Sequence, residues 1–360
     1  MRAVHFAEPG RAVVVERPRP HVIEPDDAVV MVTTAGLTAW DIAMCEEPWL
    51  DEGGASLTAT LLPITPGSGQ RLSRGERAQG SQRERAYPTV PGGEFAGSIV
   101  ELGPAVKGFQ INDVVFALSG WKEPDGRARM FGRDGLDGGH ADYVRVPHAD
   151  RLLLKTTAGA EERSLLAGGT LGLGAGAADL AMSRHRDGRL VVAGCDPLGI
   201  AALAVLHRSG AFAQVAAFDL RPARLALAKR YGARPVNVRD PEAAESVMPA
   251  DVVIAGALAD RPGTAWIAGA VRPGGTIVFT EPDGLGKWAA LDVPVRPGLQ
   301  MVAAEWPSQE QASKLATLVH MKRLDLAPVV SHVVPLDLAG DAYREALMRG
   351  PTVLKVLLKP

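Results

Sequence analysis

Residues 189–199 (RLVVAGCDPLG) combine residue types and spacing that are typical of a phosphate-binding turn. After an apolar run, Gly194, Asp196 and Gly199 take the three positions of the G-x-G-x-x-G dinucleotide fingerprint. Gly194 suits a tight turn, Gly199 lets a helix approach a strand, and the free N–H groups of that helix favour an anion. Asp219 lies 20 residues beyond Gly199, where it can accept hydrogen bonds from ribose hydroxyls. This pattern predicts a bound dinucleotide and favours NAD(H) over NADP(H).

Asp196 departs from the fingerprint because a carboxylate stands where the backbone normally approaches phosphate. Two like charges about 4 Å apart repel by roughly 4 kcal/mol at an effective dielectric constant of about 20, which weakens binding unless the side chain turns away. The alternative is a strand–turn–helix unit that binds no dinucleotide. The residues expected to bind the cofactor are Gly194, Asp196, Pro197, Leu198, Gly199, Asp219 and Arg224.

Apolar strands and alanine-rich helices alternate around this turn from residue 157 onward. The predicted strands are residues 190–193, 214–218, 252–255, 276–280 and 301–304, and the predicted helices are residues 199–209, 221–231 and 263–270. We therefore predict a series of β–α–β units over residues 157–305.

Residues 1–156 differ because short β-branched segments between turn residues predict strands, with almost no helical periodicity. This pattern indicates a barrel-like β-rich domain, and residues 306–360 return to the same style. Residues 66–86 hold one leucine among glycines, arginines and glutamates, which predicts a flexible surface insertion. Contact between its arginines and an anionic substrate is the alternative.

The composition excludes several classes of protein. A chain of 360 residues with 46% hydrophobic and 22% charged residues is typical of a soluble protein and favours two domains. The net charge of −2 gives no broad positive field for nucleic acid. Cys45 and Cys195 form no disulfide or zinc motif, which fits a reducing cytoplasm. No signal peptide and no apolar run of about 18 residues is recognised, so we expect neither export nor a membrane span.

Further motifs lie in order along nearly the whole chain: residues 91–103 (PGGEFAGSIVELG), 108–115 (GFQINDVV), 138–147 (GGHADYVRVP), 218–233 (FDLRPARLALAKRYGA), 271–279 (VRPGGTIVF) and the terminal VLKVLLKP. Together with the Gly194 turn they resemble the medium-chain dehydrogenase/reductase family, which includes zinc alcohol dehydrogenases and zinc-free quinone reductases. The resemblance implies an α/β fold with a GroES-like catalytic domain, residues 1–156 and 306–360, and a Rossmann domain with a doubly wound parallel sheet, residues 157–305. It also implies an active site in the cleft between them and a homodimer or homotetramer.

The resemblance shows where this chain departs from the zinc branch of the family. That branch places one zinc ligand in a CGxD motif, one in a GHE motif and one near the first linker helix. The corresponding residues look like Thr38, Gly93 and Gly169, and none can bind zinc through its side chain in the usual way. The four-cysteine structural lobe is also missing, because residues 46–194 contain no cysteine. We expect no zinc.

By the same resemblance, the candidate catalytic residues are Thr38, Asp41, Glu94 and Trp40. Thr38 is a hydrogen-bond donor for a substrate oxygen, and Glu94 or Asp41 is a candidate proton carrier. The alternative is that both carboxylates only anchor the backbone. A substitute metal site of Cys45, Glu94 and His140 is a further alternative, although its spacing matches no metal motif.

Without a metal to stabilise an alkoxide, reduction of an already polarised substrate is favoured over oxidation of a simple alcohol. We therefore expect a zinc-independent NAD(P)H-linked reductase for a conjugated carbonyl, a quinone or an activated C=C bond. The alternative is a repurposed scaffold with non-redox activity, such as a cyclase or isomerase, or with ligand binding only.

Overall fold

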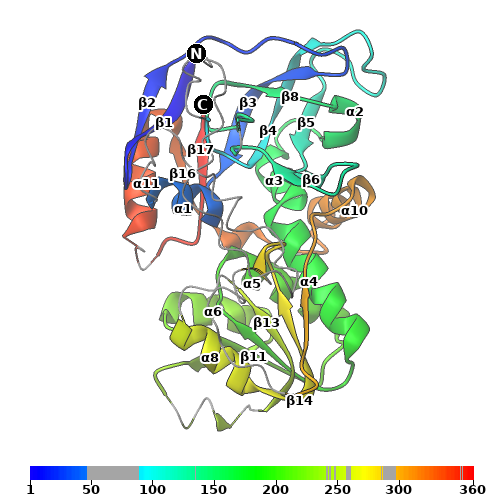
Figure 1. Cartoon of the computed structure of the whole chain (residues 1–360), viewed down its shortest axis with the longest axis vertical. Helices are drawn as coiled ribbons and strands as arrows, with labels where there is room; N and C mark the ends of the chain where they lie inside the picture. Colours follow the sequence, from blue (N-terminus) through cyan, green and yellow to red (C-terminus); the bar gives the residue numbers. More distant parts are fainter. Residues whose placement is uncertain are drawn as a thin grey trace, which may run out of the picture.

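The computed structural model describes residues 1–46, 89–133, 135–240, 242, 245–246, 249–256, 261–284, 286, 297–348, 350 and 352–360. The insertion predicted for residues 66–86 lies outside the described residues. Figure 1 shows two parts along the long axis, and both chain termini lie in the upper, strand-rich part.

The upper part is built on a mixed sheet that joins both ends of the chain. Its strands are β3 (Ala28–Gly36), β4 (Glu94–Leu102), β5 (Val114–Ala117), β8 (Tyr143–Val146), β9 (Leu153–Lys155), β16 (Val330–Pro335) and β17 (Lys355–Lys359). The order is β16-β17-β3-β4-β5-β9, and β8 also pairs with β3. In the antiparallel β3–β4 pair, Gly36 lies opposite Glu94, and in the β17–β3 pair Leu357 lies opposite Gly36. The last strand therefore brings C-terminal residues beside Glu94.

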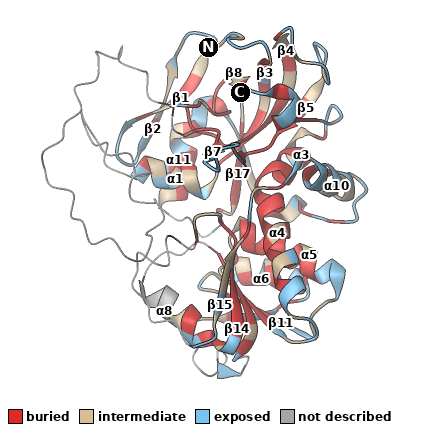
Figure 2. Ribbon diagram, turned by 45° about the vertical axis from the view of Figure 1, so that its right-hand side comes forward, coloured by how far each residue is buried: buried red, intermediate tan, exposed pale blue. Residues whose placement is uncertain are grey.

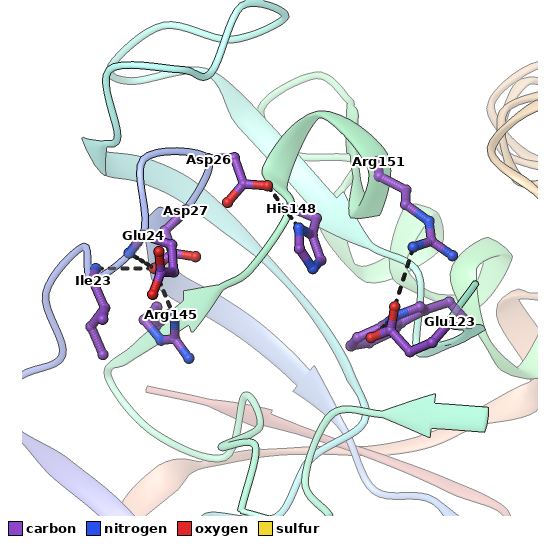
Figure 3. Close-up of polar contacts among 9 residues, drawn as sticks. Ile23, Glu24, Asp26, Asp27, Glu123, Arg145, His148 and Arg151 are labelled. Carbon is purple, nitrogen blue, oxygen red and sulfur yellow. Dashed lines mark hydrogen bonds and ion pairs between the residues drawn. The ribbon is translucent and has the colours of Figure 1, made fainter. Parts of the chain in front are cut away.

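A buried carboxylate fixes the start of β3. Asp27 Oδ2 accepts hydrogen bonds from the backbone N–H groups of Ile23 (3.0 Å) and Glu24 (2.8 Å) and from the guanidinium of Arg145 in β8 (2.7 Å), as Figure 3 shows. Burial alone would raise the pKa of Asp27, but the hydrogen bonds from Glu24, Arg145 and Ile23 outweigh it and lower that pKa. The charged carboxylate thus ties the loop before β3 to β8.

The lower part contains the predicted doubly wound sheet. Its strands are β10 (Arg189–Ala193), β11 (Gln214–Asp219), β12 (Arg234–Asn237), β13 (Ala250–Ala255), β14 (Val271–Phe279) and β15 (Gln300–Ala303). They are all parallel in the order β12-β11-β10-β13-β14-β15. The sheet grows in both directions from β10, and such a switch point is where open α/β sheets bind ligands.

Alternate residues of the central strand, β10, face two separate hydrophobic cores. Leu190 and Val192 pack in the core that also takes up α4 (Thr170–Arg184) and α5 (Pro197–Ser209). Val191 and Ala193 face the other core, with Ile267 of α8 (Arg261–Ala270). Side chains of a strand alternate between faces, so an apolar run such as this one indicates a sheet covered on both sides. In Figure 2, strand β14 of this sheet is drawn mostly as buried.

Helices connect the two parts near the cleft. α3 (Glu161–Gly168) packs against β4, β5 and α10 (Gln309–His320) and is followed directly by α4. The N-terminus of α10 is closed by a capping box in which Ser308 Oγ accepts from the Gln311 N–H. Farther along, α11 (Ala339–Leu347) packs against the hairpin strand β2 (Arg11–Glu16), whose partner is β1 (Arg2–Glu8).

Several short elements correct the sequence-based predictions. Residues 1–156, in which almost no helical periodicity was recognised, contain the short helices α1 (Ala39–Glu46) and α2 (Ala149–Leu152). Strand β12 and the hairpin of β6 (Gly120–Lys122) and β7 (Ala128–Met130) were not predicted. Helices α1 and α2 are too short to show the helical period, and β6, β7 and β12 carry no run of apolar residues that would predict a strand.

Candidate functional site

The turn between β10 and α5 has the geometry that the glycine spacing predicts. Gly194 has a φ of +96°, a conformation that strains any residue with a Cβ. A Cβ on Gly199 would overlap the carbonyl oxygen of Gly194, so only glycine lets α5 pack this closely. The Gly194 N–H donates to the carbonyl oxygen of Phe218 (2.9 Å), which ties the turn to β11.

Asp196 is the N-cap residue of α5. Its Oδ1 accepts a hydrogen bond from the Gly199 N–H (2.8 Å), and Pro197 follows as the first helical residue. The carboxylate therefore satisfies one of the N–H groups that a phosphate would meet and places a negative charge at the positive end of the helix. The turn fits a dinucleotide in its backbone, while Asp196 competes with a phosphate for this position.

Asp219 closes β11 and holds two backbone turns together. Its Oδ2 accepts from the Cys195 N–H (2.9 Å), and its Oδ1 accepts from the Arg221 N–H (2.8 Å). Arg224 Nη1 lies 4.0 Å from the same carboxylate, and Arg224 Nη2 donates to the Val353 carbonyl oxygen (3.3 Å). The carboxylate is thus set rigidly beside the glycine turn, in keeping with a ribose-binding role.

A cavity of about 530 Å³ joins the two parts of the molecule. Three of the candidate catalytic residues line it, as do five of the residues predicted to bind the cofactor: Thr38, Trp40 and Glu94, with Gly194, Asp196, Pro197, Leu198 and Arg224. Asp41, Gly199 and Asp219 are not among its lining residues. The structure therefore brings most of the two predicted sets to one cleft.

Asp41 anchors the start of α1. Its Oδ2 accepts from the N–H (2.8 Å) and the hydroxyl (2.6 Å) of Thr38, and its Oδ1 accepts from the Gly92 N–H (2.8 Å). The side chain is 2% exposed. These contacts favour the anchoring alternative for Asp41, and they hold Thr38 in place at the cavity wall.

Glu94 forms an ion pair that the sequence analysis missed. Lys355 Nζ of β17 lies 2.6 Å from Glu94 Oε2, and both side chains are almost completely buried. The other carboxylate oxygen, Oε1, accepts from the Thr170 N–H at the start of α4. A Cβ on Gly36 would come within 2.7 Å of Glu94 Oε2 and 3.1 Å of Lys355 Nζ, so glycine makes room for the pair. The only sequence signal was a lysine inside the terminal apolar strand.

Ser119 lies next to this pair. A Cβ on Gly169 would lie 2.3 Å from both the Ser119 Oγ and Glu94 Oε1, so both oxygens border the space next to Gly169. Ser119 is 2% exposed, lines the cavity, and its hydroxyl has no hydrogen-bond partner within the described part of the chain. Buried hydroxyls are normally hydrogen-bonded, so this one is available to a ligand.

The residues that resemble zinc-ligand positions all line the same cavity: Thr38, Gly93 and Gly169. Glu94 and Ser119 fill the space that a side chain at position 169 would need. Among the described residues, no group of three or more His, Cys, Asp and Glu side chains could hold a metal ion. The donor set therefore does not fit zinc.

The substitute site of Cys45, Glu94 and His140 is not assembled either. His140 is fully buried, and its ring nitrogens contact the Tyr343 hydroxyl (2.9 Å) and the Gly36 carbonyl oxygen (3.2 Å). Burial lowers the pKa of His140, partly opposed by the charge of Asp41, and burial raises the pKa of Cys45 to about 11. His140 is a packing and hydrogen-bonding residue beneath the cavity.

Aromatic rings line the cleft as well. Trp40 and Trp306 lie with ring centroids 5.2 Å apart, and the Trp306 ring covers Gly120 so closely that a Cβ there would overlap it. Trp306, Ser119 and Lys355 were absent from the sequence-based set because their places in the cleft depend on pairing between distant segments. Together they give the cavity an apolar wall and a polar floor.

No single helix in the described ranges has the length and apolar character needed to cross a membrane. The consecutive pair α3 and α4, bent by 46° at their junction, meets that criterion by length and composition only.

Comparisons with known proteins agree with this architecture. Residues 71–157 match the alcohol dehydrogenase GroES-like domain family. The chain is 29% identical to a probable zinc-binding alcohol dehydrogenase of Mycobacterium tuberculosis, over 100% of this chain and 89% of the relative. It is 30% identical to zinc-type alcohol dehydrogenase B of Aspergillus flavus, over 66% of this chain, and spans about half (51%) of that relative.

A solved structure shows the same fold. Alcohol dehydrogenase TADH from Thermus sp. ATN1 superposes with a TM-score of 0.74 at 23% identity, over 100% of this chain and 99% of that one. The GroES-like sheet, the parallel sheet with its glycine turn, the shared cleft and the full-length relative agree with one another. These findings support the medium-chain dehydrogenase/reductase family of oxidoreductases as the family of this chain.

Proposed function

We propose that this protein is a zinc-independent, NAD(P)H-linked oxidoreductase that reduces a conjugated carbonyl, a quinone or an activated C=C bond. The observation that carries the proposal is the floor of the cleft. There, Thr38, Gly93 and Gly169, the residues that resemble the zinc-ligand positions of the family, line the cavity, and the nearby carboxylate of Glu94 is neutralised by Lys355 at 2.6 Å.

A cleft without a Lewis acid stabilises a simple alkoxide poorly. A conjugated substrate spreads the developing charge over its own bonds, so orientation and one or two hydrogen-bond donors suffice. The apolar wall of Trp40, Trp306 and Met130 suits such a flat, unsaturated molecule. These features support a small-molecule substrate with an extended π system.

The nicotinamide cofactor, when bound, supplies the hydride. The backbone at Gly194 and the N-terminus of α5 are the groups expected to hold its pyrophosphate, and Asp219 is expected to hold its ribose hydroxyls. A carboxylate at this position repels a 2′-phosphate, which supports NAD(H) over NADP(H).

We also propose that the protein forms a homodimer or homotetramer and acts in the cytoplasm. The family resemblance supports a homodimer or homotetramer. Cys45 and Cys195 are both free and buried, which is compatible with the reducing cytoplasm as the site of action.

The test has two measurements on the purified protein. Metal content is determined by mass spectrometry, and NADH and NADPH oxidation are followed with cinnamaldehyde, cyclohexenone and benzoquinone as acceptors and with ethanol plus NAD as the reverse control. We expect turnover of at least one conjugated acceptor that chelators leave unchanged. Stoichiometric zinc together with loss of activity in chelator would overturn the zinc-free assignment.

The N-cap contact of Asp196 favours a second candidate, a repurposed scaffold that binds its ligand without redox chemistry. Because Asp196 Oδ1 already accepts from the Gly199 N–H, this turn is less open to a pyrophosphate than one with glycine at position 196. Failure of both NADH and NADPH to bind the wild-type protein would support this candidate.

A further inference from the structure

The floor of the cleft combines a buried cation with a hydroxyl that lacks a partner among the described residues. Lys355 Nζ contacts Glu94 Oε2 at 2.6 Å, and the Ser119 hydroxyl and Glu94 Oε1 both border the space next to Gly169. Lys355, Glu94 and Ser119 all line the cavity. An ammonium group has three N–H donors, so the contact with Glu94 leaves Lys355 with donors for a ligand.

A buried ion pair contributes little to the stability of a protein, because the cost of desolvating the two charges offsets much of the attraction between them. Here the pair faces a cavity instead of a packed core, and Gly36 and Gly169 both lack the Cβ that would displace it. Glu94 balances the charge of Lys355 at 2.6 Å, so the floor holds a charged ammonium group without carrying a net charge.

We propose that Lys355 and Ser119 form the subsite that receives the substrate oxygen, with Lys355 supplying the positive charge that a metal would otherwise supply. Glu94 is a positioning residue, since it holds the ammonium group through Oε2 and is itself held by the Thr170 N–H through Oε1. The ligand class is a molecule whose oxygen carries or develops negative charge, such as an enone, a quinone or a conjugated carboxylate.

This inference rests on the proposed function for its redox step. The reduced nicotinamide is the two-electron reductant and ends as the oxidised nicotinamide. As the substrate carbon gains a C–H bond, its π electrons move toward the oxygen, Lys355 and Ser119 donate hydrogen bonds to that oxygen, and Lys355 transfers one proton to it. The neutral amine then recovers a proton from water, so each turnover consumes one reduced cofactor and one proton.

The test uses cinnamate, a conjugated carboxylate, in isothermal titration calorimetry without cofactor. The variants are Glu94→Gln, Ser119→Ala, the double variant Glu94→Gln/Lys355→Met, and Lys359→Met as the matched control. Lys359 lies on the same strand and pairs with Glu162 (2.7 Å), away from the cavity. The double variant avoids an unpaired buried charge, and circular dichroism checks the fold of each protein.

We expect the Glu94→Gln variant and the double variant to change cinnamate affinity in opposite directions. Glu94→Gln frees the ammonium group and tightens cinnamate binding, while the double variant weakens it by about 10–100-fold relative to Glu94→Gln, the worth of one charged hydrogen bond. Ser119→Ala weakens binding by about 3–10-fold, and Lys359→Met leaves it unchanged. A merely structural pair would give weaker binding in both the single and the double variant.

Several outcomes overturn the inference: no binding of cinnamate to the wild-type protein, equal affinity for Glu94→Gln and the double variant, or loss of NADH affinity in the double variant with cinnamate affinity unchanged. The last result would assign Lys355 to the cofactor. Because cinnamate binding needs no turnover, this test separates the subsite from the proposed reaction. If the protein reduces the acceptors but the variants do not change cinnamate affinity as expected, only the proposed subsite is contradicted. If the variants change cinnamate affinity as expected but no acceptor is reduced, only the proposed reaction is contradicted.

Discussion

The two ends of the cleft are built in different ways. At the nucleotide end, the turn, the helix cap and the partner carboxylate all lie within residues 189–219, and hydrogen bonds link Cys195 to Asp219 and Asp196 to Gly199. At the floor, Glu94 and Ser119 lie 25 residues apart, and Lys355 joins them from the last strand of the chain. The first end follows a local pattern that a sequence displays, whereas the second depends on strand pairing. Substitutions at each end test this difference.

The largest effect is expected at the floor. Lys355→Met leaves the carboxylate of Glu94 buried and unpaired, which should lower the free energy of unfolding by about 3–5 kcal/mol, as measured by urea denaturation. The double variant Glu94→Gln/Lys355→Met should recover most of that loss. Equal destabilisation in the single and double variants would mean that the two side chains are not coupled.

The next effect is expected at the nucleotide end. Gly199→Ala places a methyl group against the carbonyl oxygen of Gly194 and should cost about 1–3 kcal/mol of unfolding free energy. Gly176→Ala in α4 is the matched control, because a Cβ there meets its nearest atoms at 3.7 Å. This control should gain up to about 1 kcal/mol from the better helix propensity of alanine. A neutral Gly199→Ala would contradict the close packing of α5.

A smaller effect on binding separates the redox proposal from its competitor. Asp196→Gly removes the carboxylate at the N-terminus of α5 and should tighten NADH binding about tenfold, or about 1.4 kcal/mol, measured by quenching of tryptophan fluorescence. Glycine is itself a tolerated N-cap, so the fold should lose only a few tenths of a kcal/mol. Asp196→Asn keeps the cap without the charge and should give an intermediate affinity. Unchanged or weaker NADH binding in both variants would contradict competition between Asp196 and phosphate.

The smallest effect is expected for His140, whose buried imidazole should make the free energy of unfolding depend on pH. Burial lowers the pKa of His140 in the folded state, so the unfolded chain binds more protons below its ordinary pKa of about 6.5. Stability from this group is therefore complete above that pH and falls as the pH falls. The loss should reach about 0.7 kcal/mol between pH 7 and 6 if the folded ring stays neutral. His140→Gln should remove this part of the pH dependence in urea denaturation, and an unchanged slope would show that His140 does not cause it.

Much of the nucleotide end was predictable because its determinants are contiguous. The positive φ of Gly194 and the close approach at Gly199 follow from residue type and spacing, and the parallel strands followed from apolar runs. The α1 helix was missed because it is too short to show the helical period, and the hairpin of β6 and β7 was missed because its strands carry no run of apolar residues. Asp196 was recognised as a departure, but only coordinates could show that it caps α5.

The sequence by itself indicated the family, the two kinds of sheet and the positions that resemble those of zinc ligands, because these depend on residue identity at fixed spacings. Only the tertiary structure decided which side chains surround those positions. β17 pairs with β3, which pairs with β4, and this order carries Lys355 across more than two hundred residues to Glu94. The physical reason is that a buried lysine requires a compensating charge, and the partner that supplies it is set by the packing of distant strands.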